Sequence, residues 1–182
     1  LVLLATGLAV SFAVIAHIAR LEQREQALAI EQTKAREERE NWARHSAMPT
    51  VRQLREDGHW VRAFLLAKDI LPVLPHDPVF QELWSNLTVT VTFDLDPAGT
   101  KVFVRDWNGK DDDWLKLGET PLVNVTLPKG TLRFRYVKEG YIAREFEELS
   151  ESMNARGPVL LKKDFGVPEG MVFVERIQAA AW

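Results

Sequence analysis

The chain contains no cysteine, and its formal net charge of −3 over 182 residues gives it no basic excess. The missing cysteines exclude a disulfide framework, a thiol nucleophile and any metal site with thiolate ligands. Nucleic-acid binding requires a basic face, so we expect no nucleic-acid partner. An oxidising compartment stays open, because a domain with an adequate core needs no disulfide.

No motif in the sequence predicts catalysis. The four histidines lie in separate segments without the spacing of metal ligands, and no glycine-rich phosphate loop or nucleophile elbow is present. The run Asp111–Asp113 is the one carboxylate cluster, but three consecutive side chains point in different directions beside Lys110. Calcium loops space their ligands differently, so we interpret this run as a solvated loop tip. We expect no catalytic residue, cofactor, metal site or small-molecule substrate.

Residues 1–19 contain no ionised side chain, and the first charge is that of Arg20. A helix of this length is just long enough to cross a hydrocarbon core of about 30 Å. A secretory signal peptide would need a basic start, and a buried core helix rarely opens a chain. We therefore predict a transmembrane helix over 1–19, which makes the membrane a partner.

Residues 20–47 are predicted to continue as a helical stalk. The segment from Arg20 to Arg44 lacks glycine and proline and is rich in strong helix formers. Apolar residues seven apart form one thin stripe, made of Val14, Leu21, Leu28, Ala35 and Trp42. The companion positions are polar, so a two-stranded coiled coil is not predicted. The stripe is either exposed to solvent or packed on a neighbouring protein. Leu21, Leu28 and Trp42 are therefore candidate partner-binding residues.

Residues 48–87 have the pattern of a short helical hairpin. Apolar side chains from Trp60 to Leu74 recur at helical spacing, and Asp77-Pro78 is a typical helix start. The pattern resembles one tetratricopeptide-type hairpin. A single hairpin cannot build a solenoid, so we interpret it as a connector packed against the following residues.

From residue 88 to 165 the hydrophobic period changes to two. Residues 88–95 alternate in this way, and further short strands follow between glycine and proline turns. The predicted fold class is α+β, in which a transmembrane and stalk helix and a short hairpin precede a small antiparallel β-sandwich. The predicted sandwich core includes Val91, Phe93, Val104, Phe134 and Tyr136.

The turns of this region resemble those of the PEGA domain, a small extracytoplasmic β-sandwich of bacterial surface and envelope proteins. Four motifs carry the resemblance in order over about residues 89–148, namely Pro97-Ala98-Gly99-Thr100-Lys101-Val102-Phe103-Val104, Gly118-Glu119-Thr120-Pro121, Leu127-Pro128-Lys129-Gly130 and Lys138-Glu139-Gly140-Tyr141. The resemblance implies that this part lies outside the cytoplasm. The lysines and arginines after residue 19 favour the opposite side, but only one flank is visible to the positive-inside rule. We therefore expect a single-pass cell-membrane protein with a periplasmic or extracytoplasmic module.

The wider order of segments resembles the region after the kinase domain in some bacterial receptor-type serine/threonine kinases. The segment from Val167 to Val174 resembles the junction at which a further enzymatic domain begins in such proteins, and we treat 166–182 as a tail. No kinase motif is present, so the resemblance brings no catalytic residue with it.

Three tryptophans are the remaining candidates for partner binding. Trp107 and Trp114 flank a polar loop, where they either fold back over the sandwich edge or anchor a partner. Trp182 ends an alanine-rich tail with nothing local to bury it. The leading hypothesis is a non-catalytic, membrane-anchored protein-binding module, a scaffold or accessory subunit that contacts other membrane or envelope proteins. The alternative is the sensory ectodomain of a receptor kinase whose kinase domain lies upstream.

Overall fold

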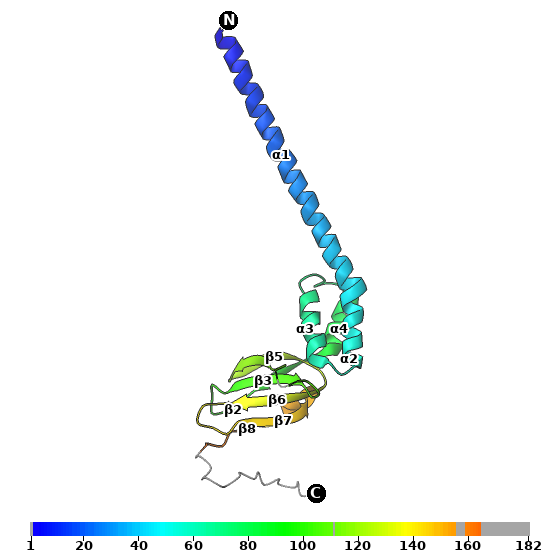
Figure 1. The fold of residues 1–182 in the computed structure, drawn as a ribbon, viewed down its shortest axis with the longest axis vertical. Helices are drawn as coiled ribbons and strands as arrows, with labels where there is room; N and C mark the ends of the chain where they lie inside the picture. The colour runs from blue at the N-terminus through cyan, green and yellow to red at the C-terminus, as the bar shows by residue number, and fades with distance from the viewer. Residues whose placement is uncertain (1, 111, 156–158, 165–182) are drawn as a thin grey trace.

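The computed structural model describes residues 2–110, 112–155 and 159–164, with side chains described from Arg20 onward. The fold is α+β, with a long helix that leads into a helical unit resting on a β-sandwich (Figure 1). The helices are α1 (Val2–Trp42), α2 (Met48–Glu56), α3 (Trp60–Ile70) and α4 (Pro78–Leu87), and a π-helical turn at Ala43–Ala47 joins α1 to α2.

The prediction of a transmembrane helix over residues 1–19 is corrected by the structure. Within the described part of the chain, no helix is long and apolar enough to cross a membrane. Residues 2–19 are instead the first part of α1, a single helix of 41 residues that passes Arg20 without a break. Every side chain from residue 20 to residue 39 is exposed. The helix does continue past Arg20 into a charged, exposed stalk as the sequence predicts, and the transmembrane prediction fails because this helix is not apolar enough to cross a membrane.

The helical unit has its own core, built where α1 ends. Ala43 and Ala47 of the π-helical turn are buried, and their small side chains let α2 and α3 approach closely. Phe80 of α4 is fully buried, and Trp84 packs beside it with ring centroids 6.2 Å apart. The buried members of this core are Ala43, Ala47, Met48, Val51, Ala63, Ala67, Ile70, Leu74, Phe80, Leu83 and Leu87.

The sandwich has three groups of strands. A four-stranded antiparallel sheet has the order β4-β3-β6-β7, β1 pairs antiparallel with β5, and β2 pairs parallel with β8. The parallel pair of β2 with β8 departs from the predicted antiparallel sandwich. The strands are β1 (Thr88–Phe93), β2 (Leu95–Asp96), β3 (Lys101–Asp106), β4 (Leu115–Glu119), β5 (Leu122–Pro128), β6 (Thr131–Val137), β7 (Arg144–Leu149) and β8 (Val159–Leu160), with a 3-10 helix at Ser150–Ala155.

Alternation along the strands places one face of each sheet in a common core. In β6, Leu132, Phe134 and Tyr136 are fully buried and the intervening residues are half-buried. Phe93 of β1 faces Phe134 across the sandwich, with ring centroids 6.1 Å apart. The prediction that Val91, Phe93, Val104, Phe134 and Tyr136 share one core is confirmed. The predicted strand over 88–95 is divided, because a register shift follows Val91 and Leu95 joins β2 instead.

Candidate partner-binding surface

Hydrogen bonds that complete helix ends join the helical unit to the sandwich. Oδ1 of Asp106, the last residue of β3, accepts the N–H of Val61 in the first turn of α3 at 2.8 Å. After β5, Lys129 donates its N–H to the Leu87 carbonyl at 2.7 Å and its Nζ to the Ser85 carbonyl at 2.9 Å. Helix ends carry backbone groups that have no partner within the helix. The β-strand region therefore completes one end of α3 and one end of α4.

Packing reinforces this junction. Val61 of α3 is 5% exposed and belongs to the core of the sandwich rather than to that of the helical unit. Trp60 lies over Gly130, so closely that a Cβ on Gly130 would lie 2.6 Å from Cδ2 of the indole. Gly130 also has a φ of +142°, a backbone conformation that side chains disfavour. The two units are thus held together by a buried valine, a tryptophan and a glycine.

Trp114 lies just before β4, between two guanidinium groups. The Cζ atom of Arg105 lies 4.7 Å from its ring centroid, and that of Arg135 lies 4.4 Å away. Each contact is a cation–π interaction. The indole is half-buried, and its Nε1 finds no acceptor among the described residues. This geometry agrees with the alternative in which Trp114 folds back over the edge of the sandwich. A partner-binding role for Trp114 stays a prediction.

Trp107 follows β3 and is 51% exposed. Its Nε1 lies beside the turn between α2 and α3, 4.0 Å from the position that a Cβ on Gly58 would occupy. On the same loop, Asp113 accepts the N–H of Lys110 at 3.0 Å and lies 3.9 Å from the guanidinium of Arg62. The loop therefore lies against the helical unit with half of the Trp107 ring exposed.

The predicted stalk residues lie on α1, of which Trp42 is the last residue. Leu21 is 45% exposed, Leu28 is 56% exposed and Trp42 is 42% exposed. They are exposed along the helix, and none of the contacts of the described residues joins them to Trp107 or Trp114. Trp182 lies outside the described residues. The six predicted partner-binding residues therefore form no single site in the described part of the chain.

A groove that the sequence did not predict lies between the helical unit and the sandwich. Its volume is about 430 Å³, and Leu65 and Leu71 at its rim are 41% and 40% exposed. Phe64 and Trp84 stack in it with ring centroids 5.8 Å apart. The residues that line the groove are Phe64, Leu65, Lys68 and Leu71 from α3 and its C-terminal end, Trp84 from α4, Leu115, Lys116 and Leu117 from β4, and Val125 and Thr126 from β5. We call this set the junction groove.

The junction groove combines an apolar surface with positive charge. Seven of its ten lining residues are aliphatic or aromatic, two are lysines, and none is acidic. Nζ of Lys68 lies 5.7 Å from the ring centroid of Phe64, and Lys116 forms an exposed ion pair with Glu119 at 3.2 Å. Exposed ion pairs contribute little, so the pairing of Lys116 does not prevent it from contacting another anion.

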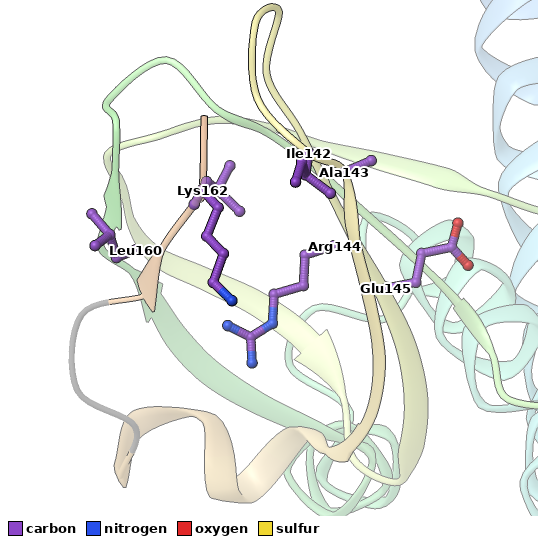
Figure 2. Close-up of a pocket in the computed structure, with 7 residues that line it drawn as sticks. Ile142, Ala143, Arg144, Glu145, Leu160 and Lys162 are labelled. Atoms are coloured by element: carbon purple, nitrogen blue, oxygen red, sulfur yellow. The ribbon is translucent and has the colours of Figure 1, made fainter. Parts of the chain in front are cut away.

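A second pocket lies between the beginning of β7 and the segment around β8 (Figure 2). Its volume is about 290 Å³, and its backbone walls are joined by a hydrogen bond from the Ile142 N–H to the Lys162 carbonyl at 2.9 Å. Arg144 and Lys162 extend into it, whereas Glu145 points away. The guanidinium of Arg144 is already placed 5.6 Å from the Phe146 ring centroid. Leu160, which also lines this pocket, is 67% exposed.

Among the described residues, no group of histidine and carboxylate side chains is arranged to hold a metal ion. No family model, curated protein or solved structure matches the chain. The resemblance to the PEGA domain therefore stays a prediction that rests on the four turn motifs. Two of their glycines, Gly99 and Gly140, have φ values of +73° and +76°, as tight turns require.

Proposed function

We propose that this chain is a non-catalytic protein-binding module whose binding site is the junction groove. The observation that carries the proposal is the exposure of Leu65 and Leu71 at an apolar groove formed by two units that hydrogen bonds and buried side chains join. Exposed apolar surface with a polar rim is typical of protein interaction sites. The hydrogen bond from Val61 to Asp106 supports a groove of constant shape, which lowers the entropic cost of binding.

The test is co-purification of the tagged full chain from its native source, followed by identification of stoichiometric partners. Replacing both Leu65→Ser and Leu71→Ser should weaken retention of such a partner about thirtyfold, as the loss of a central interface residue does. Leu160→Ser is the matched control, because Leu160 is equally apolar, more exposed and remote from the groove. The melting temperature of all three proteins should be the same. A stoichiometric partner retained equally by wild type and the double variant would contradict the proposal.

A second candidate function is the relay of a signal between the sandwich and the long helix. It is favoured by the connection from α1 through the π-helical turn Ala43–Ala47, whose Ala43 and Ala47 are buried in the core of the helical unit. In a relay, partner binding at the groove should change amide hydrogen exchange of Ala43–Ala47 in the full chain. A pure scaffold should leave the exchange of this turn unchanged.

A further inference from the structure

Two strand edges border the junction groove. In a β-strand, successive side chains point to opposite faces of the sheet. Three consecutive residues of β4, Leu115 to Leu117, nevertheless line the same groove, as do Val125 and Thr126 of β5. Consecutive residues line one groove when it runs along the edge of the strand, where their backbone groups lie. The groove therefore reaches the edges of β4 and β5.

The order of the strands agrees with this placement. Within the described sheets, β4 pairs with β3 alone and β5 pairs with β1 alone, although only Thr120 and Pro121 separate them in the chain. Their facing edges thus diverge from a shared turn. An open strand edge presents backbone N–H and C=O groups that pair readily with an additional strand.

We propose that the junction groove binds an extended, acidic and apolar segment of a partner protein by pairing with the edge of β4. This inference rests on the proposed function and specifies the chemistry of the partner. Apolar side chains of the segment would contact the Phe64–Trp84 stack, and its carboxylates would lie near Lys68 and Lys116. Recognition of this kind obtains affinity from backbone pairing and specificity from alternate side chains.

Charge complementarity selects the partner. The groove has two lysines and no carboxylate, although the whole chain is negative with a formal net charge of −3. The pairing of β4 with β3 shifts its register between Val102 and Phe103, and this shift leaves Leu117 in a bulge. The bulge limits how many residues of a partner segment can pair with the edge of β4. A short paired segment binds weakly through its backbone alone, so the lysines and the aromatic stack must contribute to recognition.

The probe is an eight-residue peptide that alternates valine and glutamate, titrated into the full chain and followed by backbone amide shifts. We expect shifts at Leu115 to Leu117 and at the indole N–H of Trp84. Two comparison peptides test the two parts of the proposal. A peptide that alternates valine and lysine should bind about tenfold more weakly, because two attractive charge contacts become repulsive. A valine–glutamate peptide with an N-methyl group on every residue should also bind at least tenfold more weakly, because neither of its edges can then donate hydrogen bonds to the strand edge.

The charge-reversed chain, Lys68→Glu with Lys116→Glu, is the decisive variant. Both side chains are exposed, so we expect it to keep its melting temperature and to prefer the lysine peptide. Equal binding of the two peptides to the unchanged protein would overturn the acidic specificity. Full binding of the N-methylated peptide would overturn the strand mode, as would a concentration-dependent dimer that groove substitutions abolish. If these tests fail while Leu65→Ser with Leu71→Ser still releases a native partner, the proposed function stands and only this inference fails.

Discussion

Helices α3 and α4 lie next to each other in the helical unit but begin in different ways. The cap of α4 is local, because Oδ1 of Asp77 accepts the N–H of Phe80 at 2.9 Å, three residues along the chain. The N-cap position of α3 is His59, which makes no capping bond with its side chain. Instead, α3 takes its carboxylate from Asp106, 45 residues further along the chain.

The two carboxylates also differ in their electrostatics. The hydrogen bond from the Phe80 N–H, with the contact to Arg44, lowers the pKa of Asp77 below its ordinary value of 3.8, against a smaller effect of burial. Burial raises the pKa of Asp106, although the Val61 N–H and the nearby His59 and Arg62 act in the opposite direction. A local cap stabilises one helix. A distant cap at a buried site costs free energy, because the carboxylate loses its hydration. In return, it joins the helical unit to the sandwich.

The largest expected effect is at the junction itself. In Gly130→Ala the new methyl group would overlap the indole of Trp60, and the backbone would keep a φ that favours glycine. We expect a loss of about 3 kcal/mol in the free energy of unfolding of the full chain, measured by denaturant titration.

Gly140→Ala is the matched control for this substitution. Gly140 also has a positive φ, of +76°, but a Cβ there meets no atom within 4 Å. Its cost should therefore be the backbone strain alone, about 1 kcal/mol. Equal losses for the two variants would mean that the contact between Trp60 and Gly130 does not hold the units together.

A smaller effect separates the distant cap from the local one. Asp106→Ala removes the carboxylate that accepts the buried Val61 N–H and leaves that N–H without its acceptor, so we expect a loss of about 2 kcal/mol. Asp77→Ala should cost about 1 kcal/mol, the usual cost of removing a helix N-cap. Denaturant unfolding of both variants gives the comparison, and a larger loss for Asp77→Ala would reverse our ranking of the two caps.

Local signals explain what could be predicted from the sequence. The Asp77-Pro78 helix start and the alternation of Val91 and Phe93 depend on neighbouring residues, and the structure confirms both. The α+β order of helices followed by strands was predictable for the same reason. The transmembrane prediction went wrong on an equally local signal, because the absence of charge over residues 1–19 does not by itself make a helix apolar enough to cross a membrane.

Distant contacts explain what could not be predicted. The junction groove combines residues from α3, α4, β4 and β5, none of which stands out in its own segment. The placement of Trp114 depends on Arg105 and Arg135, and nothing near Trp114 in the sequence indicates the second arginine. Trp60 marks the junction only once Gly130 is known to lie under it. Such sites arise where two units meet, so sequence spacing carries no signal for them.

The smallest expected effect concerns pH, and it tests the opposite pKa shifts directly. A carboxyl with a raised pKa in the folded state favours folding most below its unfolded value, and this contribution is lost as the pH rises through the folded pKa. A carboxyl with a lowered pKa contributes above its unfolded value and loses that contribution as the pH falls through the folded pKa. The ordinary value of 3.8 therefore separates the two pH windows.

Asp106→Asn and Asp77→Asn remove each titration while keeping a side-chain oxygen as helix cap. The stability of wild type relative to Asp106→Asn should fall as the pH rises above 3.8. The stability of wild type relative to Asp77→Asn should be constant above 3.8 and fall as the pH drops below it. Unfolding titrations of the three full-length chains between pH 2.5 and pH 7, at about half-unit steps, measure both differences. If both stability differences changed in the same direction over the same pH range, Asp106 would not be held in a desolvated site. The junction would then lack its buried carboxylate.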